Sequence, residues 1–269
     1  MTAGALGAAE KLWCALVNTI FPDDCRVCGE PLRNVSRIPV CLRCLDDHAP
    51  LSADYACIAC RMPFVSPFPL DQDGKCALCR LGVSGFDAVY SYGSYEGALR
   101  KLIQLFKYDR VRPLAAHFGK LMAIVLPREE RFDVIVPMPL HWRRRWERGY
   151  NQAALLAREI STRWNTPVRN IVRRRRATKP QAGLTNAKRR ANVAGAFRIK
   201  PGVRLDGMRV LLVDDVLTTG ATASACARVL KRAGARRVTL LAVARTDRRA
   251  SVNYEFKAGA RAATWGGVA

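Results

Sequence analysis

Eight of the ten cysteines in this 269-residue chain form four Cys-x-x-Cys pairs, a spacing typical of metal binding. One pair presents two thiolates to a tetrahedral ion, and two pairs separated by 12 or 15 residues complete a four-cysteine site. The spacing therefore predicts two zinc sites. Four thiolates leave no position for water, so we expect structural rather than catalytic zinc. The candidate ligands are Cys25, Cys28, Cys41, Cys44, Cys57, Cys60, Cys76 and Cys79.

The pairing of these cysteines is open between two arrangements. We expect consecutive pairing, with the first four residues on one ion and the last four on the other, whereas an interleaved cross-brace uses the same eight residues. A disulfide scaffold is less favoured, because it needs an oxidising compartment and Glu10 and Lys11 interrupt any apolar export signal. No apolar run reaches the ~20 residues of a membrane helix. We expect a cytoplasmic protein with no membrane partner.

A second segment also carries residues that could bind a ligand. In it, an apolar strand is followed by two acids, and a loop of threonines and glycine then leads into a helix. Loop amides and hydroxyls can surround a phosphate at the positive end of that helix, and a glycine allows close backbone approach. Carboxylates at the strand tip accept hydrogen bonds from vicinal hydroxyls. The segment therefore predicts a ribose 5-phosphate site. Its candidate residues are Val213, Asp214, Asp215, Thr218, Thr219, Gly220, Ala221 and Thr222.

The elements needed to position this segment follow from residue 85 onward, where apolar periodicity alternates between strand and helix types. We expect strands at 87–92, 132–136, 196–200, 209–213 and 237–244, with helices at 96–107, 113–126, 150–163 and 220–233. Alternation of this kind builds a mainly parallel sheet covered by helices, with ligands at the carboxyl ends of the strands. No P-loop or dinucleotide fingerprint is present, which argues against a nucleoside triphosphatase or a dinucleotide site.

The net charge of +23 is confined to this second part. Residues 1–80 contain 8 Lys and Arg against 9 Asp and Glu, and the remaining residues carry 37 against 13. Such a field favours nucleic acid or a multiply phosphorylated small molecule, although a solvated basic surface explains it as well. For the runs Arg143 to Arg145 and Arg173 to Arg176 we favour exposed charge. For Trp142 and Trp146 two roles are possible, stacking on nucleic-acid bases or packing on the sheet.

Several motifs together resemble one family. The segment Val213 to Thr222 resembles the phosphoribosyl pyrophosphate signature of type I phosphoribosyltransferases. The chain as a whole resembles the ComF (ComFC-like) family, which joins a double zinc ribbon to that fold. The likeness covers roughly residues 14–245. Besides the signature and the cysteine pairs, it includes Phe21-Pro22, Lys107-Tyr108, Val136 to Leu140, Arg148 to Gln152, Lys179 to Gln181, Leu184 and Arg189 to Val193.

The resemblance implies a role for each motif. Pro137 and Met138 face the pyrophosphate, with Arg148 as a further contact. The acids Asp214 and Asp215 face the ribose hydroxyls and their Mg²⁺ and are the candidate catalytic residues. Residues 179–193 are either a mobile flap over the substrate or a solvated basic loop. The implied domains are an N-terminal helix at 1–22, the double zinc ribbon at 23–82, the phosphoribosyltransferase-like domain at 85–246 and a loose tail at 247–269.

Two functions are then open. The first is a phosphoribosyltransferase that displaces pyrophosphate from phosphoribosyl pyrophosphate. The second is a non-catalytic sensor of that ligand whose basic domain binds single-stranded DNA during DNA uptake, as the ComF resemblance implies. The near-neutral cysteine module is also a candidate adaptor to a helicase or recombination protein.

Overall fold

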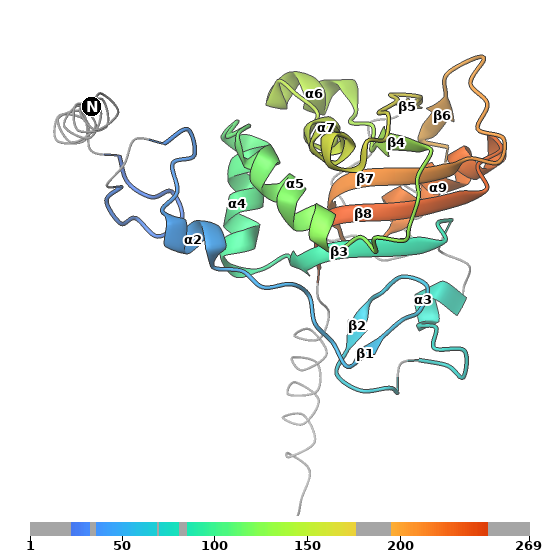
Figure 1. Cartoon of the computed structure of the whole chain (residues 1–269), viewed down its shortest axis with the longest axis horizontal. Coiled ribbons are helices and arrows are strands. Elements are labelled where there is room, and N and C mark those ends of the chain that lie inside the picture. The colour runs from blue at the N-terminus through green and yellow to red at the C-terminus, as the bar shows by residue number, and fades with distance from the viewer. Residues whose placement is uncertain (1–22, 33–35, 69, 81–84, 176–194, 247–269) are drawn as a thin grey trace, which may run out of the picture.

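The computed structural model describes residues 23–32, 36–68, 70–80, 85–175 and 195–246 (Figure 1). The expected N-terminal helix at 1–22, the segment 179–193 and the tail at 247–269 lie outside the described residues. Among the described residues, no helix has the length and apolar character needed to cross a membrane.

A four-stranded parallel sheet forms the centre of the larger domain. Its strands are β3 (Ala88–Ser94), β8 (Arg237–Arg245), β7 (Arg209–Leu217) and β4 (Val134–Pro137), in that spatial order. The residues of β4 and most of those of β7 and β8 are buried, as expected for apolar strands covered on both faces. The sequence-based expectation of a mainly parallel sheet is confirmed.

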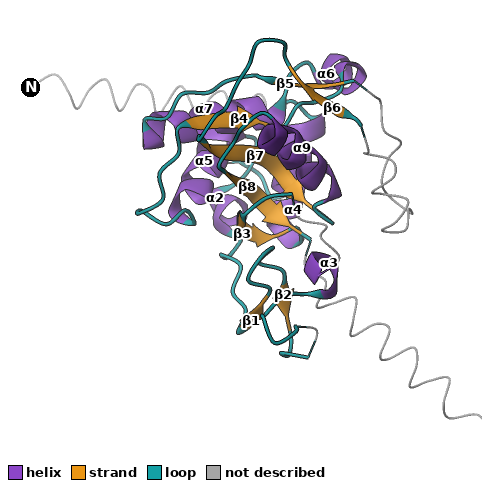
Figure 2. Ribbon diagram, turned by 90° about the vertical axis from the view of Figure 1, so that its right-hand side faces the viewer, coloured by secondary structure: helices purple, strands orange, loops and turns teal. Residues whose placement is uncertain are grey.

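Helices cover both faces of this sheet (Figures 1 and 2). On one side, α4 (Gly97–Tyr108), α5 (Leu114–Ile124) and α7 (Gln152–Trp164) enclose a core that includes Leu211 and Val213. On the other side, α9 (Ala221–Arg232) encloses a second core with Val210 and Leu212. Because successive strand residues point to opposite faces, the Val-Leu-Leu-Val run of β7 supplies both cores.

The structure differs from the sequence-based expectation in three places. Strand β7 continues through both acids to Leu217, because β8 runs alongside and pairs with it as far as Arg245. The strand expected at 196–200 forms as β6 (Phe197–Ile199), but it pairs antiparallel with β5 (Val172–Arg174) in a separate two-stranded sheet. A helix not expected, α6 (Trp142–Arg148), contains no buried residue and so has no apolar stripe to reveal it.

The two cysteine quartets occupy different places. The first, which includes α2 (Leu42–Asp46), lies beside α4, and its Cys25 and Cys44 belong to the core under α4 and α5. The second carries β1 (Tyr55–Ala56), β2 (Pro63–Phe64) and α3 (Ala77–Arg80) and has a small core of its own. The two quartets are therefore attached to the sheet domain separately.

Candidate functional site

The cysteine quartets have the geometry of four-thiolate metal sites. In each quartet all four Sγ atoms lie within 4.8 Å of one another. Cys28 Sγ to Cys41 Sγ and Cys60 Sγ to Cys76 Sγ are both 3.8 Å. Tetrahedral zinc with Zn–S bonds of ~2.3 Å separates its sulfurs by about 3.8 Å, so each quartet could hold zinc. The cysteines are grouped as consecutive pairing predicts: one quartet is Cys25, Cys28, Cys41 and Cys44, and the other is Cys57, Cys60, Cys76 and Cys79.

In each quartet, a backbone amide donates a hydrogen bond to one buried cysteine sulfur. The amide of Cys41 donates to Cys25 Sγ at 3.3 Å, and the amide of Cys76 donates to Cys57 Sγ at 3.3 Å. These hydrogen bonds stabilise negative charge on sulfur, which is the form that binds a metal. The two sites therefore repeat one local design.

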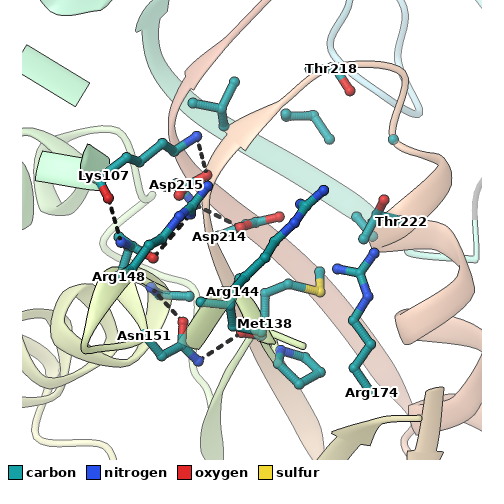
Figure 3. A pocket seen from close by; sticks show the side chains of 18 residues that line it. Lys107, Met138, Arg144, Arg148, Asn151, Arg174, Asp214, Asp215, Thr218 and Thr222 are labelled. Atoms are coloured by element: carbon teal, nitrogen blue, oxygen red, sulfur yellow. Dashed lines mark hydrogen bonds and ion pairs between the residues drawn. The ribbon is translucent and has the colours of Figure 1, made fainter. Parts of the chain in front are cut away.

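The second candidate site is a cavity of about 220 Å³ at the carboxyl ends of β4 and β7 (Figure 3). This is the edge where ligands of parallel α/β sheets bind. The residues lining it are Lys107, Met138, Pro139, Leu140, Arg144, Arg148, Asn151, Gln152, Ala153, Arg174, Asp214, Asp215, Val216, Leu217, Thr218, Gly220, Thr222 and Ala223.

The two acids at the end of β7 point to opposite faces of the sheet. Asp215 forms an ion pair of 2.9 Å with Lys107 at the end of α4, and both side chains are more than four-fifths shielded from water. Burial is the largest single influence on Lys107 and opposes its charge, but the carboxylates of Asp215 and Asp214 together outweigh it, so the pKa of Lys107 is raised. Asp214, the preceding residue, lies on the α9 side of the strand and forms no ion pair with any described residue.

The electrostatic environment of Asp214 is unusual for a carboxylate. Burial and the neighbouring Asp215 carboxylate raise its pKa to about 7. The positive charges of Lys107 and Arg174 work in the opposite direction. Arg174 itself has a lowered pKa, because it is desolvated and lies near Arg144. The cavity therefore brings two acids, Asp214 and Asp215, together with one lysine and three arginines, and cations are in excess. This excess suits an anionic ligand, and the acids offer oxygen ligands for a metal ion.

The loop between β7 and α9 has the form expected of a phosphate cradle. Gly220 adopts a left-handed conformation with φ of 76° immediately before the first helical residue, Ala221. A side chain at this position would be strained, which explains the glycine. Thr218 and Thr222 line the cavity, whereas the hydroxyl of Thr219 accepts from the amide of Ala221 at 3.4 Å. The loop thus presents a helix N-terminus to the cavity.

The segment Arg148 to Gln152 ties three parts of the site together. Tyr150 Oη donates to the carbonyl of Phe106, and Gln152 Nε2 donates to the carbonyl of Lys107 at 3.4 Å. Asn151 Nδ2 donates to the carbonyl of Met138 at 3.0 Å, and its Oδ1 caps α7. These bonds fix the end of α4, which carries Lys107, and the loop after β4. The motif predicted to contact pyrophosphate also organises the cavity.

The arginine runs divide between the cavity and the solvent. Arg143 and Arg145 are exposed while Arg144 lines the cavity, and Arg173 is exposed while Arg174 lines it. The expectation of exposed charge is therefore wrong for Arg144 and Arg174. The side chains of a strand alternate, and those of a helix spread around its axis, so only some members of each run reach one site. Arg176 lies outside the described residues.

Seven of the predicted ligand-site residues line the cavity, and four do not. The residues brought together are Met138, Arg148, Asp214, Asp215, Thr218, Gly220 and Thr222. Those outside its lining are Pro137, Val213, Thr219 and Ala221. Val213 and Ala221 are buried in the strand and the helix, where they support the acids and the loop. The sequence-based assignment overlooked Lys107 and Gln152, although both lie in motifs that carried the family resemblance.

The fold and this cavity define the chain as a phosphoribosyltransferase-type protein with two added cysteine quartets. A family model described as phosphoribosyl transferase domain matches residues 148–258. Competence protein F of Haemophilus influenzae is 32% identical over 178 residues, which cover 63% of this chain and 78% of the relative. DNA utilization protein YhgH of Escherichia coli is 30% identical over 236 residues, which cover 84% of this chain and 98% of the relative. The chain belongs to the ComF family.

A solved structure of glutamine phosphoribosylpyrophosphate amidotransferase from B. subtilis is also similar, at 21% identity and a TM-score of 0.34. The match covers 48% of this chain but spans only 26% of the amidotransferase chain. The assignment of the fold therefore rests on the family model and the strand order.

Proposed function

We propose that the cavity binds a phosphoribosyl ligand of the phosphoribosyl pyrophosphate type together with Mg²⁺. The observation that carries this proposal is the meeting, in one cavity, of two acids at the end of β7 and a glycine-threonine loop at the N-terminus of α9. In this proposal Asp214 and Asp215 accept hydrogen bonds from the ribose hydroxyls. Thr218, Gly220 and Thr222 surround the 5-phosphate.

The remaining charges of the cavity fit the pyrophosphate and the metal ion. Arg144, Arg148 and Arg174 supply positive charge around the space that the acids and the loop leave open. Mg²⁺ prefers oxygen ligands and is commonly held by one or two carboxylates plus substrate phosphates, so Asp214 and Asp215 fit it. When bound, the ion neutralises charge on the pyrophosphate. We also propose that zinc is the ion of both cysteine quartets, where it stabilises the fold.

The same cavity permits a transfer reaction. An acceptor nucleophile forms a bond to the anomeric carbon as the bond from that carbon to pyrophosphate breaks. The leaving group carries most of the developing negative charge, and the three arginines are placed to stabilise it. No covalent intermediate with the protein is required.

Ligand-induced stabilisation tests the binding proposal. We expect phosphoribosyl pyrophosphate with Mg²⁺ to stabilise the wild-type protein by about 2.7 kcal/mol at a hundredfold excess over Kd. Asp214→Asn should lose this effect. Asp206→Asn is the matched control, because Asp206 is an exposed acid of the same domain outside the cavity. Loss of stabilisation in both variants, or in neither, contradicts the proposal.

Pyrophosphate release separates an enzyme from a sensor. If wild-type protein binds the ligand but releases no pyrophosphate with any nucleobase, the cavity serves recognition alone. Release that depends on both an acceptor and Asp214 supports a transferase.

A role in DNA handling is the second proposed function. It is supported by the relatives named competence protein F and DNA utilization protein YhgH. It is also supported by the excess positive charge, which belongs to the part of the chain after residue 80. We propose that this part binds single-stranded DNA during DNA uptake.

A further inference from the structure

A second hollow adjoins the ligand cavity. It has a volume of about 610 Å³ and lies between α6, the start of α7 and strand β5. We call it the basic groove and define it by Trp142, Arg145, Arg158, Arg173 and Lys200. Its wall is shared with the ligand cavity, because Pro139, Leu140, Asn151 and Arg174 line both.

The charge of the basic groove is of one sign. None of its described lining residues is acidic. Arg145, Arg158, Arg173 and Lys200 form no ion pair with any residue in the described ranges. Elsewhere in the domain, by contrast, Arg209 pairs with Asp133 and Arg237 with Glu130. Four unpaired cations around one hollow form a strong attraction for a polyanion.

An aromatic side chain borders this charge. Trp142, at the first position of α6, is 65% exposed and lines the groove. The guanidinium of Arg143 lies 5.3 Å from the centre of its ring. The exposed indole offers an aromatic face at the edge of the groove. Bases stack on such rings whatever their identity, because every base has an aromatic face.

Trp142 and the surrounding cations favour a single strand over a duplex or a folded protein. The bases of a duplex are stacked inside the helix and cannot reach an indole at the edge of a groove. A strand with free bases can place a base on Trp142 while its phosphates contact the arginines on either side. The groove's volume is within the range of ordinary small-molecule sites, which corresponds to about one or two nucleotides.

We propose that the basic groove is the binding site for a single nucleic-acid strand, and that the strand competes with a pyrophosphate ligand in the adjoining cavity for Arg174. This inference deepens the proposed DNA role, and only its competition step rests on the proposed ligand. Arg174 lines both hollows, and two polyanions on either side of one guanidinium repel each other. Each ligand therefore weakens the other to the same extent.

A titration of strand affinity against salt tests the groove. The probe is a fluorescent oligothymidylate of roughly 12 nucleotides, and its binding to the full chain is measured by anisotropy. We expect Arg145→Ala/Arg158→Ala to weaken binding at least tenfold and to reduce the slope of log K against log salt by about 1.4. Trp142→Ala should weaken binding about tenfold with little change in slope.

Arg232→Ala/Arg236→Ala is the matched control for charge. Both arginines are exposed and lie outside the groove and the cavity. This variant should bind the strand as the wild type does. If it loses as much affinity as the groove variant, or if a duplex binds equally well and Trp142→Ala has no effect, the groove is only part of a basic surface and the proposal is overturned.

The competition is measured with phosphoribosyl pyrophosphate and Mg²⁺ added to the same titration. We expect strand affinity to fall several-fold in the wild type and to be unchanged in Asp214→Asn. Unchanged or tighter strand binding in a wild-type protein that is stabilised by the ligand overturns the competition. If the ligand stabilises nothing while the groove variants still lose the strand, the ligand proposal fails and the groove proposal stands.

Discussion

The adjacent strands β7 and β8 end side by side, with Leu217 opposite Arg245, but their ends belong to different environments. The end of β7 carries Asp214 and Asp215 into the ligand cavity. The end of β8 carries Arg245 into a dry contact with the second cysteine quartet. Arg245 is only 1% exposed, and it donates to the carbonyl of Cys60 at 2.6 Å and lies 3.4 Å from Met62 Sδ.

This difference shows how charge can be used in two ways at one edge of a sheet. In the cavity, the acids face an open space and Asp215 is paired with Lys107. A cationic ligand group can replace Lys107 in this pair, and an anionic one can replace Asp215. At the junction, Arg245 is buried and contacts a carbonyl and a thioether of the second quartet's segment. We interpret the first arrangement as suited to binding and the second as a permanent attachment of the quartet to the sheet.

Removing the second quartet should produce the largest effect. We expect Cys57→Ser/Cys76→Ser to lose one of two bound zinc ions and to lower the free energy of unfolding by several kcal/mol. The loss has two sources, because a bound metal contributes folding energy and Arg245 loses its contacts with Cys60 and Met62. Zinc analysis and urea unfolding measure it.

Cys226→Ser is the control for this variant, because Cys226 is buried in α9 and belongs to neither quartet. It should retain both ions. If the quartet variant keeps two zinc ions, the cysteines do not bind the metal as we propose.

Replacing the buried cation alone should have the next largest effect. Arg245→Met removes the donor to Cys60 and should cost about 2–4 kcal/mol of stability. The first quartet offers a matched comparison, since Lys101 Nζ donates to the carbonyl of Val27 at 2.9 Å on an exposed surface. Lys101→Met should cost less than about 1 kcal/mol. Equal losses in urea unfolding would show that the two quartets are attached alike.

The cation of the cavity should matter less to stability than Arg245. Lys107→Met leaves Asp215 beside Asp214 without its ion pair, and we expect a loss of about 1–2 kcal/mol near pH 8. Lys107→Arg should restore most of it, because the charge is kept. If Lys107→Met is as damaging as Arg245→Met, the cavity charge is structural rather than exchangeable.

The features that could be predicted from the sequence are those encoded by residues close together in the chain. The cysteine spacing gave all eight members of the two quartets, and the apolar run of β7 with its acids and glycine located the centre of the cavity. Contacts between distant segments could not be read in this way. Nothing near Arg245 in the sequence indicates that it meets Cys60, and the place of Lys107 depends on Tyr150 and Gln152 holding the end of α4.

The titration of Asp214 should give the smallest effect and the most direct distinction between the two strand ends. Its pKa is raised to about 7 in the folded protein, above the value of an exposed carboxyl group. Protonated Asp214 is therefore favoured by folding, and its contribution to stability is present at low pH and is lost as pH rises through 7.

Between pH 6 and 8 we expect wild-type protein to lose about 1 kcal/mol relative to Asp214→Asn. Urea unfolding of both proteins at each pH measures the difference. Arg245→Met should show the same pH dependence as wild type, because Arg245 does not line the cavity. A stability difference between wild type and Asp214→Asn that does not change with pH would mean that Asp214 is already ionised at pH 6 and that the cavity accepts both charges without strain.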